Sequence, residues 1–155
     1  MPSPRRVSVN NAHPALKFRQ ADVKALFRFL DEGLTGDAVP AGELSVAFVD
    51  AGEIIRLHES FLDDPTITDV ITFPGDKDEN LAGEICVCAD YAAQQAPKFG
   101  QSLSEELTLY LVHGWLHLAA YDDKAEPDRA SMREAEARTM AAVRKADKLP
   151  GFALK

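Results

Sequence analysis

The sequence has little of what marks secreted and membrane proteins. Only two of its 155 residues are cysteine, too few for a disulfide framework. No apolar run is long enough to span a bilayer. The first residues contain two arginines without an apolar stretch after them, so they do not form a secretory signal. These absences predict a cytoplasmic protein with reduced thiols and no membrane partner.

The two cysteines, Cys86 and Cys88, lie two apart in a β-like run. Alternate residues of a strand share one face, in a geometry that does not favour a bond between them. No third cysteine is present to complete a soft-metal site. We therefore expect two free thiols.

An excess of positive charge is also missing. The net charge is −8, whereas indiscriminate nucleic-acid binding normally needs a basic surface. Residues 1–30 are an exception, with six basic side chains against a single acidic one. Two interpretations stay open for this segment, a solvated helix face and a docking surface for a polyanion.

Hydrophobic periodicity predicts four strands and five helices. The strands are expected at residues 6–10, 43–50, 68–74 and 81–89. The helices are expected at residues 15–31, 51–62, 90–98 and 128–145, with a long apolar helix after a cap at Ser102 or Ser104. Residues 147–155 are interpreted as a tail, whose Phe152 and Leu154 either dock or stay free.

This element order, without repeats or linkers, predicts one α+β domain over residues 1–155. We expect a four-stranded mixed sheet covered mainly on one face by helices. The polar loop at 76–80 indicates that the last two strands are antiparallel. The long helix is too apolar for the surface, so we expect it buried at the centre.

That central helix contains two histidines, His113 and His117. A spacing of four residues places both imidazoles on one helix face, where they can bind one transition metal, usually zinc. Asp123 follows six residues later as a third ligand. Three protein ligands leave one open position, as in catalytic zinc sites. The alternative is two unrelated histidines on an interfacial helix.

Several motifs occur together in one order. Residues 113–123 read HGWLHLAAYDD, residues 68–74 read TDVITFP, and residues 81–85 read LAGEI. Over about residues 44–142 the chain resembles the YbeY family of bacterial endoribonucleases, with its HGxLHLxGYDH, TDVLSFP and LGDI motifs. The resemblance implies a zinc-dependent single-strand endoribonuclease of ribosomal RNA processing, 3′ end maturation of small-subunit rRNA and ribosome quality control.

The resemblance also implies the site and the partners. The family's three histidine ligands map onto His113, His117 and Asp123, which would hold one Zn²⁺ per chain. Single-stranded ribosomal RNA and ribosomal particles would be the partners. Three positions depart from the family pattern: aspartate replaces the third histidine at Asp123, Ala120 replaces glycine, and Leu62 stands where the family usually has a functional arginine.

Three residues outside the histidine helix are catalytic candidates. Asp69 and Glu84 are polar positions on strands otherwise built for the core, and the Thr72 hydroxyl has the chemistry to donate to a phosphate. Asp69 and Glu84 are equally well explained as a cap or a surface carboxylate. Phe73 would either stack on a base or belong to the core.

Two other functions compete with the nuclease. The ligand spacing is shared with metal-dependent peptidases, but Gly114 stands where the HExxH motif has its glutamate base. A ribosome-associated binding factor with weakened catalysis would explain the changes at Asp123, Ala120 and Leu62.

Overall fold

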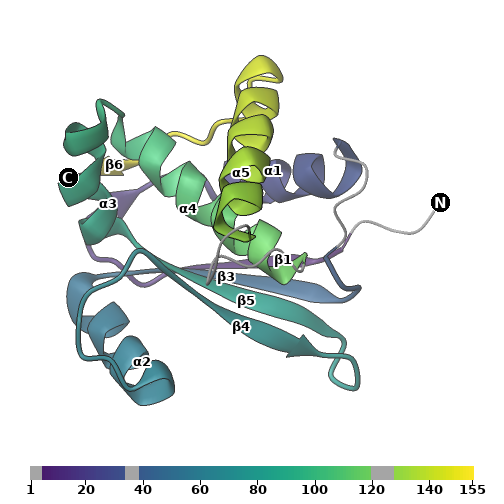
Figure 1. Cartoon of the computed structure of the whole chain (residues 1–155), viewed down its shortest axis with the longest axis horizontal. Helices are drawn as coiled ribbons and strands as arrows, with labels where there is room; N and C mark the ends of the chain where they lie inside the picture. Colours follow the sequence, from purple (N-terminus) through teal and green to yellow (C-terminus); the bar gives the residue numbers. More distant parts are fainter. Residues whose placement is uncertain (1–4, 34–38, 120–127) are drawn as a thin grey trace.

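The computed structural model describes residues 5–33, 39–119 and 128–155. Its main sheet has the strand order β1-β3-β5-β4 (Figure 1). The four strands are β1 (Val7–Asn11), β3 (Glu43–Val49), β5 (Leu81–Cys88) and β4 (Val70–Asp76). β1 and β5 run parallel to β3, and β4 runs antiparallel to β5. The predicted mixed sheet with an antiparallel last pair is confirmed.

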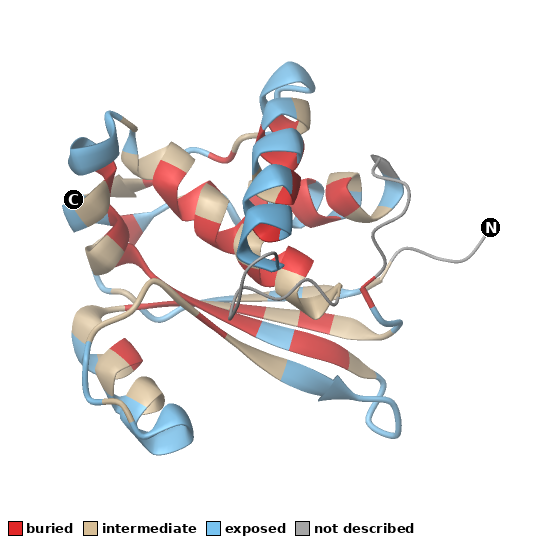
Figure 2. Cartoon of the chain, in the orientation of Figure 1, coloured by how far each residue is buried: buried red, intermediate tan, exposed pale blue. Residues whose placement is uncertain are grey.

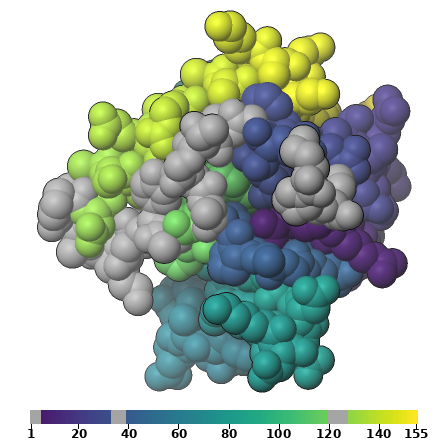
Figure 3. Space-filling model, turned by 90° about the vertical axis from the view of Figure 1, so that its right-hand side faces the viewer, coloured from purple at the N-terminus to yellow at the C-terminus, as the bar shows by residue number. Residues whose placement is uncertain are grey.

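Helices cover the two faces of this sheet unequally. On one face lie α1 (Gln20–Gly33), α3 (Ala89–Gln95), α4 (Leu103–Leu118) and α5 (Asp128–Lys145), and on the other lies α2 (Ala51–Leu62) (Figure 1). In the view turned by 90°, the yellow residues of the C-terminal part lie at the top of the molecule and the teal residues of α2 and of the turn between β4 and β5 at the bottom (Figure 3). The predicted α+β domain, covered mainly on one face, is confirmed.

The histidine helix α4 lies at the centre of the larger layer. Ser102 begins it with a capping box, because its hydroxyl accepts the Glu105 N–H and the Glu105 carboxylate accepts the Ser102 N–H. Leu107, Leu111 and Leu116 are fully buried. The buried residues of α4 lie next to the buried residues of the strands (Figure 2). The expectation of a buried central helix is confirmed.

The C-terminal segment docks on the domain. β6 (Ala153–Leu154) pairs with β2 (Leu16–Lys17) in a small antiparallel sheet. Phe152 is buried against Phe18 and Phe48, with ring centroids 5.2 and 5.4 Å away. The segment interpreted as a tail is therefore part of the fold.

Two helices differ from their expected ranges. The helix expected from residue 15 begins at Gln20, because Leu16 and Lys17 belong to β2. The helix expected over 90–98 divides into α3 and the 3-10 turn η1 (Ala96–Phe99), where Pro97 has no N–H to continue the α-helical bonding. No helix within the described residues has the length and apolar content needed to cross a membrane.

Candidate active site

One side of α4 carries polar groups in a helix that is otherwise apolar. Glu106, Tyr110, His113 and His117 follow one another at intervals of three or four residues, so they share one helix face. Glu106 and Tyr110 are each only 4% exposed. The row therefore contains a buried carboxyl, a buried phenol and two half-buried imidazoles.

The two histidines are close and nearly parallel. Their ring centroids are 6.4 Å apart and their planes differ by 13°. The His113 Nδ1 lies 3.3 Å from Oε2 of Glu136 on α5. With a proton on Nδ1 donated to this carboxylate, Nε2 carries the lone pair that a metal needs, which is the arrangement common behind metal-bound histidines.

His117 supplies a second indication of a metal. Its Nδ1 is buried and has no hydrogen-bond partner within residues 5–33, 39–119 and 128–155. Buried ring nitrogens are normally satisfied, and imidazole is a preferred zinc ligand. The two histidines therefore fit a zinc ion.

The predicted third ligand, Asp123, lies outside the described residues, as does Ala120. Among the described residues, no group of three or more His, Cys, Asp or Glu side chains is arranged to hold a metal. The predicted three-ligand site thus stays a prediction for Asp123.

A pocket of about 420 Å³ opens beside His113, between α3, η1, α4 and α5. Its polar lining consists of Asp69, Gln95, Glu106, Tyr110, His113, Arg133 and Glu136. Burial raises the pKa of the Glu106 carboxyl. Burial, with the Glu106 carboxyl beside it, also raises the pKa of the Tyr110 phenol. Both shifts disfavour the charged form relative to an exposed group of the same kind.

The three catalytic candidates fall in different places. Asp69 lines the pocket with His113, and its Oδ1 accepts the Val70 N–H at 2.7 Å. Thr72 pairs with Ile85, so it shares the sheet face that meets α4. Glu84 is the neighbour of Ile85 and points to the other face, where it lines a different pocket with Asp50 and Glu53.

Residues from the other predicted motifs also lie apart from the histidines. Phe73 packs edge-on against Phe61 of α2, at a centroid distance of 5.0 Å, in the smaller cluster of hydrophobic residues. Leu62, at the end of α2, is 60% exposed. Neither residue lines the pocket beside His113.

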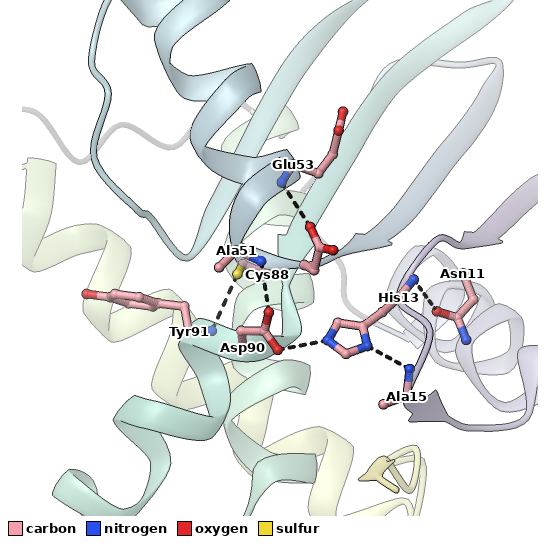
Figure 4. Close-up of polar contacts among 9 residues, drawn as sticks. Asn11, His13, Ala15, Ala51, Glu53, Cys88, Asp90 and Tyr91 are labelled. Carbon is pink, nitrogen blue, oxygen red and sulfur yellow. Dashed lines mark hydrogen bonds and ion pairs between the residues drawn. The ribbon is translucent and has the colours of Figure 1, made fainter.

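His13 belongs to a structural network instead (Figure 4). Its Nδ1 accepts the Ala15 N–H at 3.0 Å, so Nε2 carries the proton and donates to Asp90 Oδ1 at 2.8 Å. The other oxygen of Asp90 accepts the Ala51 N–H at 2.8 Å. Burial alone would raise the pKa of Asp90, but hydrogen bonds from His13 and Ala51 hold it below its ordinary value. This network joins the loop after β1 to the beginnings of α2 and α3.

The cysteines are free, as expected, and both are buried. Burial raises the pKa of the Cys86 thiol to about 12. The Cys88 Sγ accepts the Tyr91 N–H at 3.4 Å and so caps α3 (Figure 4). Protonated thiols of this kind are poor nucleophiles.

Sequence reasoning missed Glu136 and Glu106. Glu136 lies between the buried residues Met132, Ala135 and Thr139 of α5, so it interrupts the apolar stripe of an amphipathic helix. Glu106 precedes His113 by two helical turns on the same face. A carboxyl within a buried stripe was the available signal in both cases.

Comparisons with known proteins place the chain in a family. The family model described as "Endoribonuclease YbeY" matches residues 8–144. A protein of that name from Protochlamydia amoebophila is 40% identical over 143 residues, covering 90% of this chain and 93% of the relative. Another from Beutenbergia cavernae is 38% identical, covering 77% and 84%.

A solution structure from Thermotoga maritima shares the fold, with a TM-score of 0.59 at 23% identity, and covers 92% of this chain and 94% of that one. At this identity the likeness concerns the fold alone. The family assignment follows from the matched model and the curated relatives. The chain belongs to the YbeY family.

Proposed function

We propose that this chain is a metal-dependent endoribonuclease that cleaves single-stranded RNA in the cytoplasm. Its place would be ribosomal RNA processing, with 3′ end maturation of small-subunit rRNA and ribosome quality control. Membership of a family named for endoribonuclease activity supports this proposal. The observation that carries it is the pair His113 and His117 on a buried helix, with Glu136 on the Nδ1 of His113 beside an open pocket.

The proposed cofactor is one zinc ion held by His113, His117 and Asp123. The unpartnered His117 Nδ1 supports this choice, as does the carboxylate that orients His113. Zinc bound there would supply a Lewis acid for a phosphate oxygen of the RNA. An aspartate in place of a third histidine adds one negative charge, which makes the metal less acidic.

The chain's own residues would then bind and orient the substrate. Asp69, fixed by the Val70 N–H, is the candidate for holding a proton near the reacting phosphate, since it shares the pocket with His113. Thr72 faces the same side of the sheet and would donate its hydroxyl to a phosphate oxygen. Glu84, on the opposite face, is not included in this proposal.

The test uses the full chain with a fluorescently labelled single-stranded RNA, with casein as the substrate of the competing peptidase hypothesis. We expect RNA cleavage by the wild type, loss of cleavage in His117→Ala, and no effect of His58→Ala. His58 is a suitable control because it lies on α2, with its Nδ1 bonded to the Thr66 carbonyl at 2.8 Å.

Two results would contradict the proposal. Cleavage of casein but not of RNA would favour the peptidase. RNA or ribosome binding that survives His113→Ala and His117→Ala, without cleavage by the wild type, would favour a binding factor.

A further inference from the structure

The pocket beside His113 has aromatic walls. Tyr91 and Phe99 approach it from α3 and η1, and Tyr110 approaches from α4. Tyr91, Gln95 and Phe99 are spaced at four-residue intervals, which directs them to one side. Phe99 is 67% exposed at the pocket, so its ring is available for stacking with a ligand.

One buried polar group in the pocket has no hydrogen-bond partner within the described residues. This group is the hydroxyl of Tyr110, a residue that is only 4% exposed. The Glu106 carboxyl, equally buried, lies beside it one helical turn away. Because buried hydroxyls are normally satisfied, the Tyr110 hydroxyl is available to a ligand that enters the pocket.

The charge of the pocket identifies the kind of group that fits. Asp69, Glu106 and Glu136 contribute three carboxyls, and Arg133 contributes one fixed positive charge. Without the charge of the proposed zinc, these carboxyls would repel a phosphate, so the phosphate is expected only next to the histidines. A neutral ring that donates hydrogen bonds would be attracted to the carboxyls. The volume, about 420 Å³, is within the range of about 300–1,000 Å³ that small ligands occupy.

Guanine matches this description better than the other bases. Its Watson–Crick edge presents N1–H and the N2 amino group side by side, so both can donate to a single carboxylate. Uracil has one such donor, and adenine and cytosine have one amino group beside an acceptor. Single-stranded RNA is typically recognised by stacking bases on aromatic rings and by bonding these edges.

We propose that this pocket binds a guanine base of the RNA substrate, stacked on Phe99 and hydrogen-bonded to Glu106, next to the phosphate that is cleaved. This inference rests on the proposed endoribonuclease activity and adds a base preference to it. Phe99 acts as a binding residue and Glu106 as a specificity-determining residue. The unpartnered Tyr110 hydroxyl supplies a further bond to the same edge.

The experiment compares RNA oligonucleotides that differ at one position, which holds guanine, inosine, adenine or uracil. Inosine is the critical substrate because it lacks only the N2 amino group. For each RNA, KM and kcat are measured for cleavage, and binding is measured separately by fluorescence anisotropy. The variants are Phe99→Ala, Phe99→Trp and Glu106→Gln, with Phe61→Ala as the control because Phe61 is also exposed, at 63%, but lies on α2.

We expect Phe99→Ala to raise KM and weaken RNA binding by on the order of tenfold, with kcat retained. Phe99→Trp should keep KM and RNA binding close to those of the wild type, and Phe61→Ala should leave both quantities unchanged. Glu106→Gln should remove the preference for guanine over inosine, because an amide does not accept two donors as a carboxylate does. Folding is not at risk in the Phe99 variants, since that ring is mostly exposed.

The separate binding measurement distinguishes this inference from the proposed function. RNA that is cleaved equally well with any base, and unaffected by Phe99→Ala, would overturn the guanine pocket while leaving the nuclease intact. Guanine-dependent binding that requires Phe99, without cleavage, would support the pocket and overturn the nuclease. Binding of free guanosine, with no base preference in RNA, would overturn the assignment to the substrate.

Discussion

Gly114 of α4 and Ile85 of β5 are in such close contact that a Cβ on the glycine would lie 2.7 Å from Ile85 Cγ2. A side chain here would force Ile85 to shift, so glycine is favoured where the histidine helix crosses the sheet. The same contact disfavours a glutamate at position 114, the place of the general base in HExxH peptidases. Packing of the helix, rather than ligand spacing, thus separates this site from that class.

Replacing Gly114 by alanine should destabilise the fold. The added methyl group must displace Ile85 in a closely packed core, at a cost of about 1–3 kcal/mol. Urea unfolding measures this change, with Gly151→Ala as the control because nothing lies within 4 Å of a Cβ there. Equal stability of the two variants would mean that α4 moves freely away from β5.

Replacing Glu136 by glutamine should weaken zinc binding by about 10- to 100-fold, because the amide holds the His113 Nδ1 proton less strongly than the carboxylate does. Competition with a zinc-sensitive dye measures the affinity. Glu134→Gln is the matched control, since it removes the same charge from an exposed position of α5. Equal affinity of the two variants would show that Glu136 does not support a metal ligand.

The Asp90 network should make stability depend on pH. The pKa of Asp90 is lower in the folded protein than its ordinary value, so the ionised carboxyl stabilises the folded state at pH values above that ordinary pKa. This stabilisation is lost as the pH falls through the pKa of the folded state. Asp90→Asn should therefore be less stable than the wild type at pH 7, by about 1 kcal/mol, and the difference should shrink below pH of about 4. Urea unfolding at several pH values measures this, and a difference that grows on acidification would contradict it.

Phe152→Ala should cost about 3 kcal/mol of stability, because it empties a site between Phe18 and Phe48. Phe99→Ala should leave the melting temperature nearly unchanged, since the Phe99 ring is mostly exposed. Thermal unfolding compares the two variants. A large drop in the melting temperature of Phe99→Ala would mean that this ring stabilises the domain and is not free to bind a ligand.

Local signals predicted most elements of this fold. The ranges of α2 and α5 were predicted as observed, because each has a clear apolar stripe and a start signal at Asp50 or near Pro127. The start of α1 was not, because the pairing of Leu16 with Leu154 joins the two ends of the chain. No local pattern encodes such a contact.

The site was predictable only along the histidine helix. The spacing of His113 and His117 indicates a shared helix face. Glu136 contacts His113 from another helix, 23 residues later in the chain, and no local spacing indicates that contact. Glu84 looked equivalent to Asp69 in sequence, but strand alternation turns it to the opposite face. Deciding between them required knowledge of which face α4 covers.

The central claim is that His113, His117 and Asp123 hold one zinc ion, and the most direct test is the metal content of the protein purified without added metal. We expect about one zinc per chain in the wild type and in His58→Ala, and sharply less in His117→Ala and Asp123→Ala. Absence of zinc from the wild type, or equal retention by Asp123→Ala, would contradict the proposed ligand set.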